Sequence, residues 1–292
     1  MTKRSEIRIP ASEINVAGRL DASIAVVGNP NSGKSTLFNR LTGLKQRIGN
    51  YPGVTVEKHV GILKVDDHSI ELVDLPGTHS LSAHSLEEHI AVDVIFGRMQ
   101  GTKKPDGILA VLDATNLYQG LFLVQQLLEL RLPTIIALTM TDAADHSGIS
   151  IDIERLSETL GGVPIYPVVA TSGAGLERLR QAIVELRDLT PAERIVVWPE
   201  LAKFASELAE GAREPIRFAE LERLLIDGAT NANRSFLEKL SPDAQDKLEA
   251  TRDSLFGIDP PIARDARIRY AWVREVLEKV QYSAPPFYSW RS

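Results

Sequence analysis

The residues from Gly28 to Thr36 have a spacing that suits phosphate binding. They run Gly-Asn-Pro-Asn-Ser-Gly-Lys-Ser-Thr, follow an apolar stretch at 23–27 and precede a segment with helical apolar spacing. In such a loop the glycines let the backbone fold closely around an anion, and amide groups point at it from the start of the helix. Lys34 would reach the β- and γ-phosphates, and the Ser35 hydroxyl would bind Mg²⁺. The alternative is an accidental glycine turn before a helix.

A second motif, Asp74-Leu75-Pro76-Gly77, follows an apolar strand-like segment about forty residues later. An aspartate at the end of such a strand holds Mg²⁺ through water, and the amide of Gly77 can meet the γ-phosphate. Between the motifs, the glycines and proline of residues 45–55 predict a loop. Its Thr55 could order that loop in response to a γ-phosphate. The candidate catalytic residues are therefore Lys34, Thr55 and Gly77.

These motifs need a sheet to position them. Residues 56–65 and 69–73 predict a hairpin. Beyond it, predicted helices at 85–97, 118–130, 152–160 and 176–186 alternate with predicted strands at 108–112, 134–138 and 164–169. Such alternation favours an α/β fold, with a mostly parallel sheet covered by helices on both faces and with ligands at the carboxyl ends of the strands.

After about residue 190 the pattern changes, and only helices are predicted. They cover 202–211, 216–228, 233–251 and 263–280, with prolines and glycines between them. We therefore expect an α/β domain over 22–190 and a small all-helical domain over 191–282. A polar N-terminal extension over 1–21 and a C-terminal tail over 283–292 complete the predicted organisation.

Composition narrows the classes of function. The 292 residues carry a net charge of −6 and contain no cysteine. Disulfides, thiolate metal sites and cysteine nucleophiles are thus excluded, and the acidic balance does not favour nucleic acid as a partner. No apolar segment has the length and purity of a membrane span, and the polar first residues do not form a secretory signal. We expect a soluble chain.

At this point the motifs resemble a known family. GNPNSGKST, KQRIGNYPGVTVEK, DLPGTHSL and the order of the elements around them are similar to the cytosolic G domain of FeoB, the bacterial ferrous-iron transporter. The resemblance covers about residues 22–188. The helical segment to 282 resembles the domain that joins the G domain to the membrane part. It implies a Ras-like P-loop GTPase that binds GTP and GDP and hydrolyses GTP slowly, on the cytoplasmic side of the bacterial inner membrane.

The resemblance also implies partners. They are GTP, GDP and the membrane-embedded portion of the same full-length protein, which is absent from these 292 residues. Self-association of the chain stays open, and nucleic acid is not expected.

Residue roles follow from the same resemblance. Ser35 and Thr55 would be direct Mg²⁺ ligands, and Asp74 would act through water. The phosphates would be bound by Asn31, Ser32, Gly33, Lys34, Ser35 and Thr36.

Asn31 resembles the K⁺ ligand of potassium-dependent GTPases of this group. Carbonyl groups of Gly49 and Tyr51 would complete the cage around the ion. K⁺ there could supply the charge that an arginine finger supplies elsewhere. The alternative is an Asn31 side chain that only caps its own loop.

Two departures from common GTPase patterns affect hydrolysis and base recognition. Thr78 stands where Ras-like proteins have a water-orienting glutamine, which FeoB proteins also lack, so we expect slow hydrolysis. His79 either assists hydrolysis or is an exposed histidine of the switch region.

The motif expected to recognise the base is Thr139-Met140-Thr141-Asp142, in which Asp142 can accept hydrogen bonds from guanine. Thr139, however, has a hydroxyl where the family has an amide, so a bond toward N7 or to the neighbouring loop would be lost.

A third loop completes the expected base site. Backbone amides of Ala170, Thr171 and Ser172 would contact guanine O6.

Two other functions compete with a transporter GTPase. One is a soluble RNA- or ribosome-associated GTPase, which the acidic balance disfavours. The other is a nucleotide-sensing module with relaxed base specificity, suggested by Thr78 and Thr139. Glu87, Glu88 and His89 form a weak alternative iron site, and a solvated first helical turn is the preferred interpretation.

Overall fold

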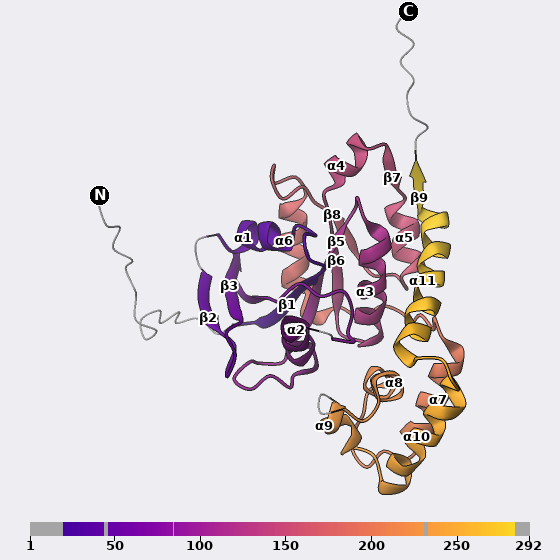
Figure 1. Cartoon of the computed structure of the whole chain (residues 1–292). Helices are drawn as coiled ribbons and strands as arrows, with labels where there is room; N and C mark the ends of the chain where they lie inside the picture. Colours follow the sequence, from indigo (N-terminus) through magenta and orange to yellow (C-terminus); the bar gives the residue numbers. More distant parts are fainter. Residues whose placement is uncertain (1–19, 44–45, 84, 231–232, 284–292) are drawn as a thin grey trace, which may run out of the picture.

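The computed structural model describes residues 20–43, 46–83, 85–230 and 233–283 (Figure 1). The predicted extension at 1–21 and tail at 283–292 lie outside this part of the chain, except for residues 20, 21 and 283.

The chain up to residue 188 alternates strands and helices. Its strands are β1 (Ala22–Gly28), β2 (Gln46–Asn50), β3 (Glu57–Val65), β4 (His68–Asp74), β5 (Gly107–Asp113), β6 (Thr134–Thr139), β7 (Ile149–Ile151) and β8 (Ile165–Pro167). Its helices are α1 (Lys34–Thr42), α2 (Leu86–Phe96), α3 (Leu117–Glu129), α4 (Thr141–His146), α5 (Ile153–Thr159) and α6 (Leu176–Glu185), and a 3-10 turn at Leu186–Asp188 follows.

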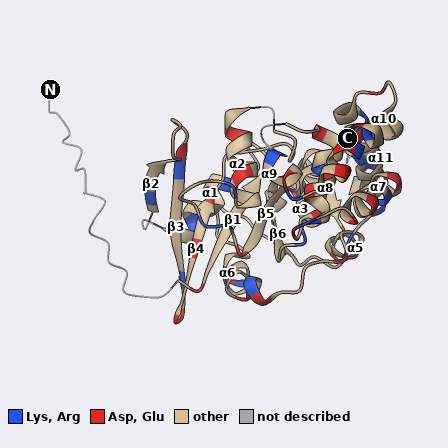
Figure 2. Cartoon of the chain, turned by 90° about the horizontal axis from the view of Figure 1, so that it is seen from below, with Lys and Arg blue, Asp and Glu red and all other residues tan. Residues whose placement is uncertain are grey.

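The rest of the described chain is almost entirely helical. It comprises α7 (Pro199–Ala209), α8 (Phe218–Asp227), α9 (Arg234–Leu237), α10 (Pro242–Phe256), α11 (Pro261–Val280) and a short strand β9 (Gln281–Ser283). Figure 1 shows α7 to α10 gathered at one end of the molecule, while α11 runs back along α3 and α5. Figure 2 shows acidic and basic residues interspersed over this helical region.

Seven strands form one sheet in the order β2-β3-β4-β1-β5-β6-β8. β2, β3 and β4 pair antiparallel, whereas β4, β1, β5, β6 and β8 run parallel. The carboxyl ends of parallel strands meet at one edge of a sheet. Gly28, Asp74 and Thr139 end β1, β4 and β6 respectively, so the sheet brings the predicted motifs to one edge. The α/β fold class is confirmed.

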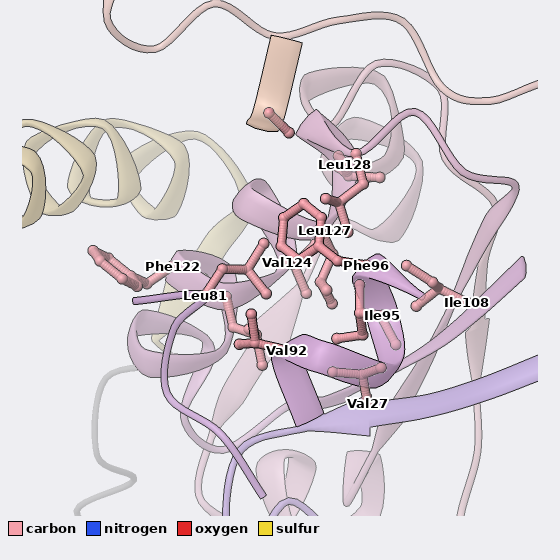
Figure 3. Close-up of a cluster of buried hydrophobic side chains, with 14 of the residues drawn as sticks. Val27, Leu81, Val92, Ile95, Phe96, Ile108, Phe122, Val124, Leu127 and Leu128 are labelled. Carbon is pink, nitrogen blue, oxygen red and sulfur yellow. The ribbon is translucent and has the colours of Figure 1, made fainter. Parts of the chain in front are cut away.

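Strand β1 shows how the sequence builds a core on both faces of the sheet. Successive side chains of a strand point to opposite faces, and all seven residues of β1 are buried. Ala25 and Val27 pack with the side chains of α2 and α3, whereas Ile24 and Val26 pack with those of α1 and α6. Figure 3 shows the first of these layers, where Val27 and Ile108 lie near apolar side chains of α2 and α3.

Three expectations from the sequence need correction. Residues 46–50 are not a loop but the edge strand β2, because their backbone groups pair with β3. The helix predicted over 233–251 is two helices, since Pro242 cannot continue α9 and Ser241 caps α10 instead. The region after residue 190 also contains a strand, because β9 pairs antiparallel with β7 of the α/β region.

A buried ion cluster joins the helical region to α3. We use this name for Glu129, Arg223, Asp265 and Arg269. Arg269 donates to Asp265 over 2.7 Å and to Glu129 over 2.8 Å, and Arg223 lies 3.7 Å from the second oxygen of Asp265. These charges belong to α3, α8 and α11. Since buried charges are tolerated only when paired, the cluster fixes how these three helices pack.

The cluster continues toward the segment that follows the Asp74 motif. Arg223 donates to the hydroxyl of Ser82, which itself donates to Asp227 over 2.9 Å. One residue earlier, the amide of Leu81 donates to the buried side chain of Gln126 on α3 over 2.7 Å. Polar contacts thus connect residues 81–82 with both the helical region and α3.

Glu222 of α8 makes stability depend on pH. Burial and the nearby Glu129 raise its pKa to about 7, although Arg269, Arg194 and Arg223 act in the opposite direction. The folded chain therefore binds this proton more tightly than the unfolded chain does. The stabilisation is complete below the ordinary pKa of 4.5 and is lost as pH rises through 7.

Glu222→Gln replaces the carboxyl group with an amide that carries no charge at any pH, so it tests this dependence. Between pH 4.5 and 7 we expect the free energy of unfolding of the wild type to fall relative to the variant, by on the order of 3 kcal/mol. Urea denaturation at several pH values measures it. Glu238→Gln alters an exposed ion pair with Arg234 and serves as the control. Parallel pH profiles for wild type and Glu222→Gln would contradict the assignment.

Candidate nucleotide-binding site

The loop between β1 and α1 has the backbone of a phosphate-binding loop. Asn31 and Gly33 adopt left-handed conformations with φ of 65° and 80°. The amide of Leu37 donates to the carbonyl of Gly33 over 2.9 Å, which starts helix α1. A Cβ atom on Gly28 would lie 2.8 Å from the carbonyl oxygen of Val111 in the neighbouring strand, so only glycine fits there. The loop therefore turns tightly at the carboxyl edge of the sheet.

A cavity of about 560 Å³ opens over this loop. It is lined by residues of the loop, of the Asp74 motif and of the starts of α2 and α4. The lining residues are Asn29, Pro30, Asn31, Gly33, Lys34, Ser35, Thr36, Pro76, Gly77, Glu87 and Met140. Five of the six residues predicted to bind phosphates line it, and Ser32 does not.

Lys34 and Asp74 meet at this cavity. The Lys34 ammonium lies 2.6 Å from one carboxylate oxygen of Asp74, and the two side chains are 9% and 10% exposed. Asp74 ends β4 and Lys34 begins α1 after the loop that follows β1, and the pairing of β1 with β4 brings them together. The ion pair holds a cation and an oxygen ligand at the mouth of the loop, where a phosphate chain and its metal would need them.

Gly77 approaches the phosphate-binding loop so closely that a side chain would not fit without movement. A Cβ there would lie 3.0 Å from the backbone nitrogen of Pro30. The next amide, that of Thr78, donates to the carbonyl of Gly28 over 3.2 Å. The Thr78 side chain is buried, and its hydroxyl donates to the carbonyl of Ser80 over 2.8 Å. Thr78 is thus engaged inside the protein and does not line the cavity.

His79 and Glu88 show that the start of α2 is more than a solvated turn. His79 is exposed, and its backbone amide donates to Glu88 over 3.1 Å. Glu88 is buried, so the interpretation of Glu87, Glu88 and His89 as a solvated turn is wrong for Glu88. Among the described residues, no group of three or more His, Asp or Glu side chains could hold a metal ion, so an iron site at these positions has no support.

The loop that carries Thr55 lies outside the cavity. Thr55 and Gly49 are exposed, and neither lines it. The Tyr51 side chain is buried in the core, and its carbonyl accepts a bond of 3.2 Å from the amide of Val54. Thr55, Gly49 and Tyr51 do not line the cavity, so their predicted metal contacts require this loop to move. Burial and the charge of Asp74 raise the pKa of the Tyr51 phenol, so that side chain lies near the Asp74 motif.

The predicted base-binding residues follow β6 and β8. Thr139 is buried, and its hydroxyl contacts the carbonyl of Ser32 in the phosphate loop over 2.8 Å. Of the two bonds expected to be at risk, the one to the neighbouring loop is therefore kept, and the bond toward N7 stays a prediction. Asp142 is exposed near the start of α4.

The second base loop lies beside α1. Thr171 and Ser172 are exposed, Ala170 is partly buried, and Arg40 of α1 donates to the Thr171 carbonyl. None of the predicted base-binding residues lines the cavity over the phosphate loop. Their roles stay predictions.

Two residues of the cavity wall, Met140 and Glu87, lie outside the predicted phosphate loop and Asp74 motif. Met140 has a positive φ of 55°, and its side chain reaches toward Gly33, whose added Cβ would lie 3.5 Å from the Met140 methyl carbon. Glu87 lies in the first turn of α2 and puts a carboxylate at the phosphate cavity. The only sequence signal for either was its position directly after a conspicuous turn.

Comparison with known proteins agrees with this geometry. A protein-family model described as ferrous iron transport protein B matches residues 22–183. The chain belongs to the FeoB family. Relatives from this family include the Fe(2+) transporters FeoB of Escherichia coli K12, 48% identical over 265 residues, and of Salmonella typhimurium, 36% identical over 265 residues. Each match covers 88% of this chain and 33% of the relative, so the chain spans about a third of the length of these FeoB proteins.

Solved FeoB structures share the fold. An S. thermophilus NFeoB mutant bound to GDP matches with a TM-score of 0.78 and 32% identity, covering 89% of this chain and all of that one. The cytosolic domain of L. pneumophila FeoB matches with a TM-score of 0.73 and 32% identity, again over 89% and 100%. The T. maritima FeoB cytosolic domain in its GMPPNP form gives 0.72 and 28%, over 90% and 100%. The chain thus carries the GTPase domain of the FeoB family and its helical region.

None of the described helices combines the length and the apolar character that a membrane crossing requires.

Proposed function

We propose that this chain binds GTP in the cavity over the phosphate loop and hydrolyses it slowly to GDP and phosphate. The observation that carries the proposal is that Lys34 and Gly77 line one cavity on the carboxyl edge of the sheet and that Lys34 pairs there with Asp74. Solved relatives bound to GDP or in a GMPPNP form support it.

The chain's own residues would act mainly by positioning and by electrostatics. Amide groups of 31–36 and the Lys34 ammonium would hold the phosphates, and Gly77 would meet the γ-phosphate from the other side. Thr78 has its hydroxyl bonded to Ser80. Its side chain is also fully buried and does not line the cavity, so it would not orient the attacking water, and turnover would be slow.

Magnesium fits the donor set at this site. Ser35 and Asp74 supply a hydroxyl and a carboxylate, the hard oxygen ligands that Mg²⁺ prefers. We propose that Ser35 binds the ion directly and Asp74 through water. Thr55 would join them after its loop moves, which makes residues 46–55 the first switch. When bound, the ion neutralises charge on the phosphates.

The experiment that tests this proposal measures binding and turnover of the whole chain. We expect fluorescent GTP and GDP analogues to bind in the presence of Mg²⁺ much more tightly than an ATP analogue. We also expect multiple-turnover phosphate release from GTP, and chelation of Mg²⁺ by EDTA should stop it. Equal binding of GTP and ATP would favour a nucleotide sensor of relaxed base specificity. Binding without phosphate release would favour a sensor that does not hydrolyse.

Potassium stimulation is a further part of the proposal. Asn31 is exposed, lines the cavity and has a φ of 65°, so its side chain is available at the phosphate loop. We propose that it binds K⁺ together with the carbonyls of Gly49 and Tyr51 when the first switch closes. The ion would then add positive charge where an arginine finger acts in other GTPases.

Replacing Asn31 with alanine tests the potassium site. In wild type we expect hydrolysis to be faster in K⁺ than in Na⁺ by on the order of tenfold. Asn31→Ala should reduce the rate in K⁺ to the Na⁺ level without changing GTP binding in Na⁺. Gln181→Ala, which removes an amide at an exposed position of α6, is the control and should keep the stimulation. A variant Asn31→Ala that is still stimulated would exclude this ligand.

The role of the whole protein is proposed from the family. FeoB relatives are Fe(2+) transporters, and about two thirds of their length has no counterpart in this chain. We propose that the chain is the cytosolic regulatory part of such a transporter, on the cytoplasmic side of the bacterial inner membrane. The domain over 191–282 would convey nucleotide state to the membrane part through the contacts of Ser82 with Arg223 and Asp227.

A further inference from the structure

Thr139 turns its side chain toward the phosphate loop. It ends strand β6, and only 2% of its surface is exposed. Its hydroxyl oxygen lies 2.8 Å from the carbonyl oxygen of Ser32 and 3.2 Å from that of Leu112. The side chain therefore faces the phosphate loop and strand β5, both of which are protein backbone.

The single donor hydrogen of the Thr139 hydroxyl limits which hydrogen bonds this residue can make to a ligand. A threonine hydroxyl has a single donor hydrogen, and both of its neighbours here are carbonyl oxygens, which only accept. The hydrogen is consequently used within the protein. Guanine N7 is also an acceptor, so it would need a donor that Thr139 no longer has. An amide at the same position has two hydrogens and could serve the loop and the base together.

We infer that Thr139 is a positioning residue of the phosphate loop, and that the site recognises guanine nucleotides by the N1 and exocyclic-amine edge and not by N7. The inference rests on the proposed GTP site. N7 is present in adenine as well as in guanine. Loss of a donor to it therefore lowers affinity for both bases and leaves the discrimination between them to Asp142 and to the amides of residues 170–172 predicted to contact O6. On this basis the departure at Thr139 does not relax base specificity.

The nucleotide 7-deaza-GTP, in which a C–H group replaces N7, tests the base-recognition part. Displacement of a fluorescent GDP analogue from the whole chain with Mg²⁺ gives the Kd of each nucleotide. For wild type we expect GTP and 7-deaza-GTP to bind within about twofold of each other. In Thr139→Asn the new donor should make GTP bind about three- to tenfold more tightly than 7-deaza-GTP. Wild-type binding of 7-deaza-GTP about tenfold weaker than GTP would overturn the inference.

Two further variants test whether the Thr139 hydroxyl positions the phosphate loop. Thr139→Val keeps the shape and removes the hydroxyl, so we expect both nucleotides to bind about three- to tenfold more weakly, by the same factor. Thr139→Ser should restore both affinities. The matched control is Thr134→Val on the same strand, since Thr134 is also 2% exposed and donates to a backbone carbonyl, that of Leu132, away from the loop. Unchanged GTP binding in Thr139→Val would overturn the positioning role.

The outcomes separate this inference from the proposed function. A wild-type chain that binds neither GTP nor 7-deaza-GTP overturns the proposed function and the inference with it. Tight and guanine-selective binding of GTP combined with poor binding of 7-deaza-GTP overturns the inference alone.

Discussion

Replacing Lys34 with alanine is expected to reduce GTP turnover on the order of a hundredfold or more. Lys34 is buried along its stem, and its ammonium lies 2.6 Å from Asp74 at the cavity over the phosphate loop. Alanine removes the positive charge that would stabilise the β- and γ-phosphates. It also leaves the Asp74 carboxylate without this partner, close to where the anionic phosphates would bind. Single-turnover and multiple-turnover phosphate release measure the loss.

A surface lysine provides the comparison. Lys203 lies on α7 and its side chain is 72% exposed, so Lys203→Ala should leave turnover unchanged. Circular dichroism of both variants should match the wild type, since truncation of one side chain at the loop does not remove a secondary structure element. Turnover in Lys34→Ala above about a third of the wild-type rate would contradict the role of Lys34 at the phosphates.

Replacing Arg269 with methionine is expected to lower the free energy of unfolding by about 3–5 kcal/mol, the range observed when one partner of a buried ion pair is removed. Arg269 is 1% exposed and is held between Asp265 and Glu129. Burial acts to lower its pKa, but the charges of Glu129 and Asp265 raise it, so the guanidinium is ionised. The variant leaves Glu129 without its cation and leaves Asp265 with only the more distant Arg223. Urea denaturation monitored by circular dichroism measures the effect.

Replacing the nearby Arg267 shows how much of the expected destabilisation depends on burial, because Arg267 carries the same charge at the surface. It lies on the same helix and pairs with Asp259 over 3.2 Å, but its side chain is 64% exposed. Exposed pairs contribute little because water screens them, so Arg267→Met should cost less than about 1 kcal/mol. Equal costs for Arg267→Met and Arg269→Met would show that the buried ion cluster does not govern the packing of α11 on α3.

Much of the fold follows from local patterns. The apolar strand before Gly28, the alternation up to α6 and the helical spacing after residue 190 each depend on residues close together in the chain, and the structure agrees with them. The errors concern partners distant in sequence. β2 is a strand because β3 offers it hydrogen bonds, and β9 because β7 does, and neither pairing has a local pattern.

The same distinction applies to the site. Gly28, Lys34, Asp74 and Gly77 could be predicted because each belongs to a motif whose chemistry needs that residue type at that spacing. The hydroxyl bond of Thr139 to Ser32 spans 107 residues, and no motif predicts where a buried hydroxyl will point. Glu87 and Met140 likewise enter the cavity wall through the way α2 and α4 begin.

The sequence by itself determined the phosphate loop, the Asp74 motif, the α/β class and the resemblance to FeoB, because these depend on residue types at short spacings. Tertiary structure alone decided which charges meet. The Lys34 pair with Asp74 and the Arg269 pair with Glu129 join residues 40 and 140 positions apart. The physical reason is burial: a charge removed from water must find a partner in space, and sequence spacing does not reveal which one folding brings near.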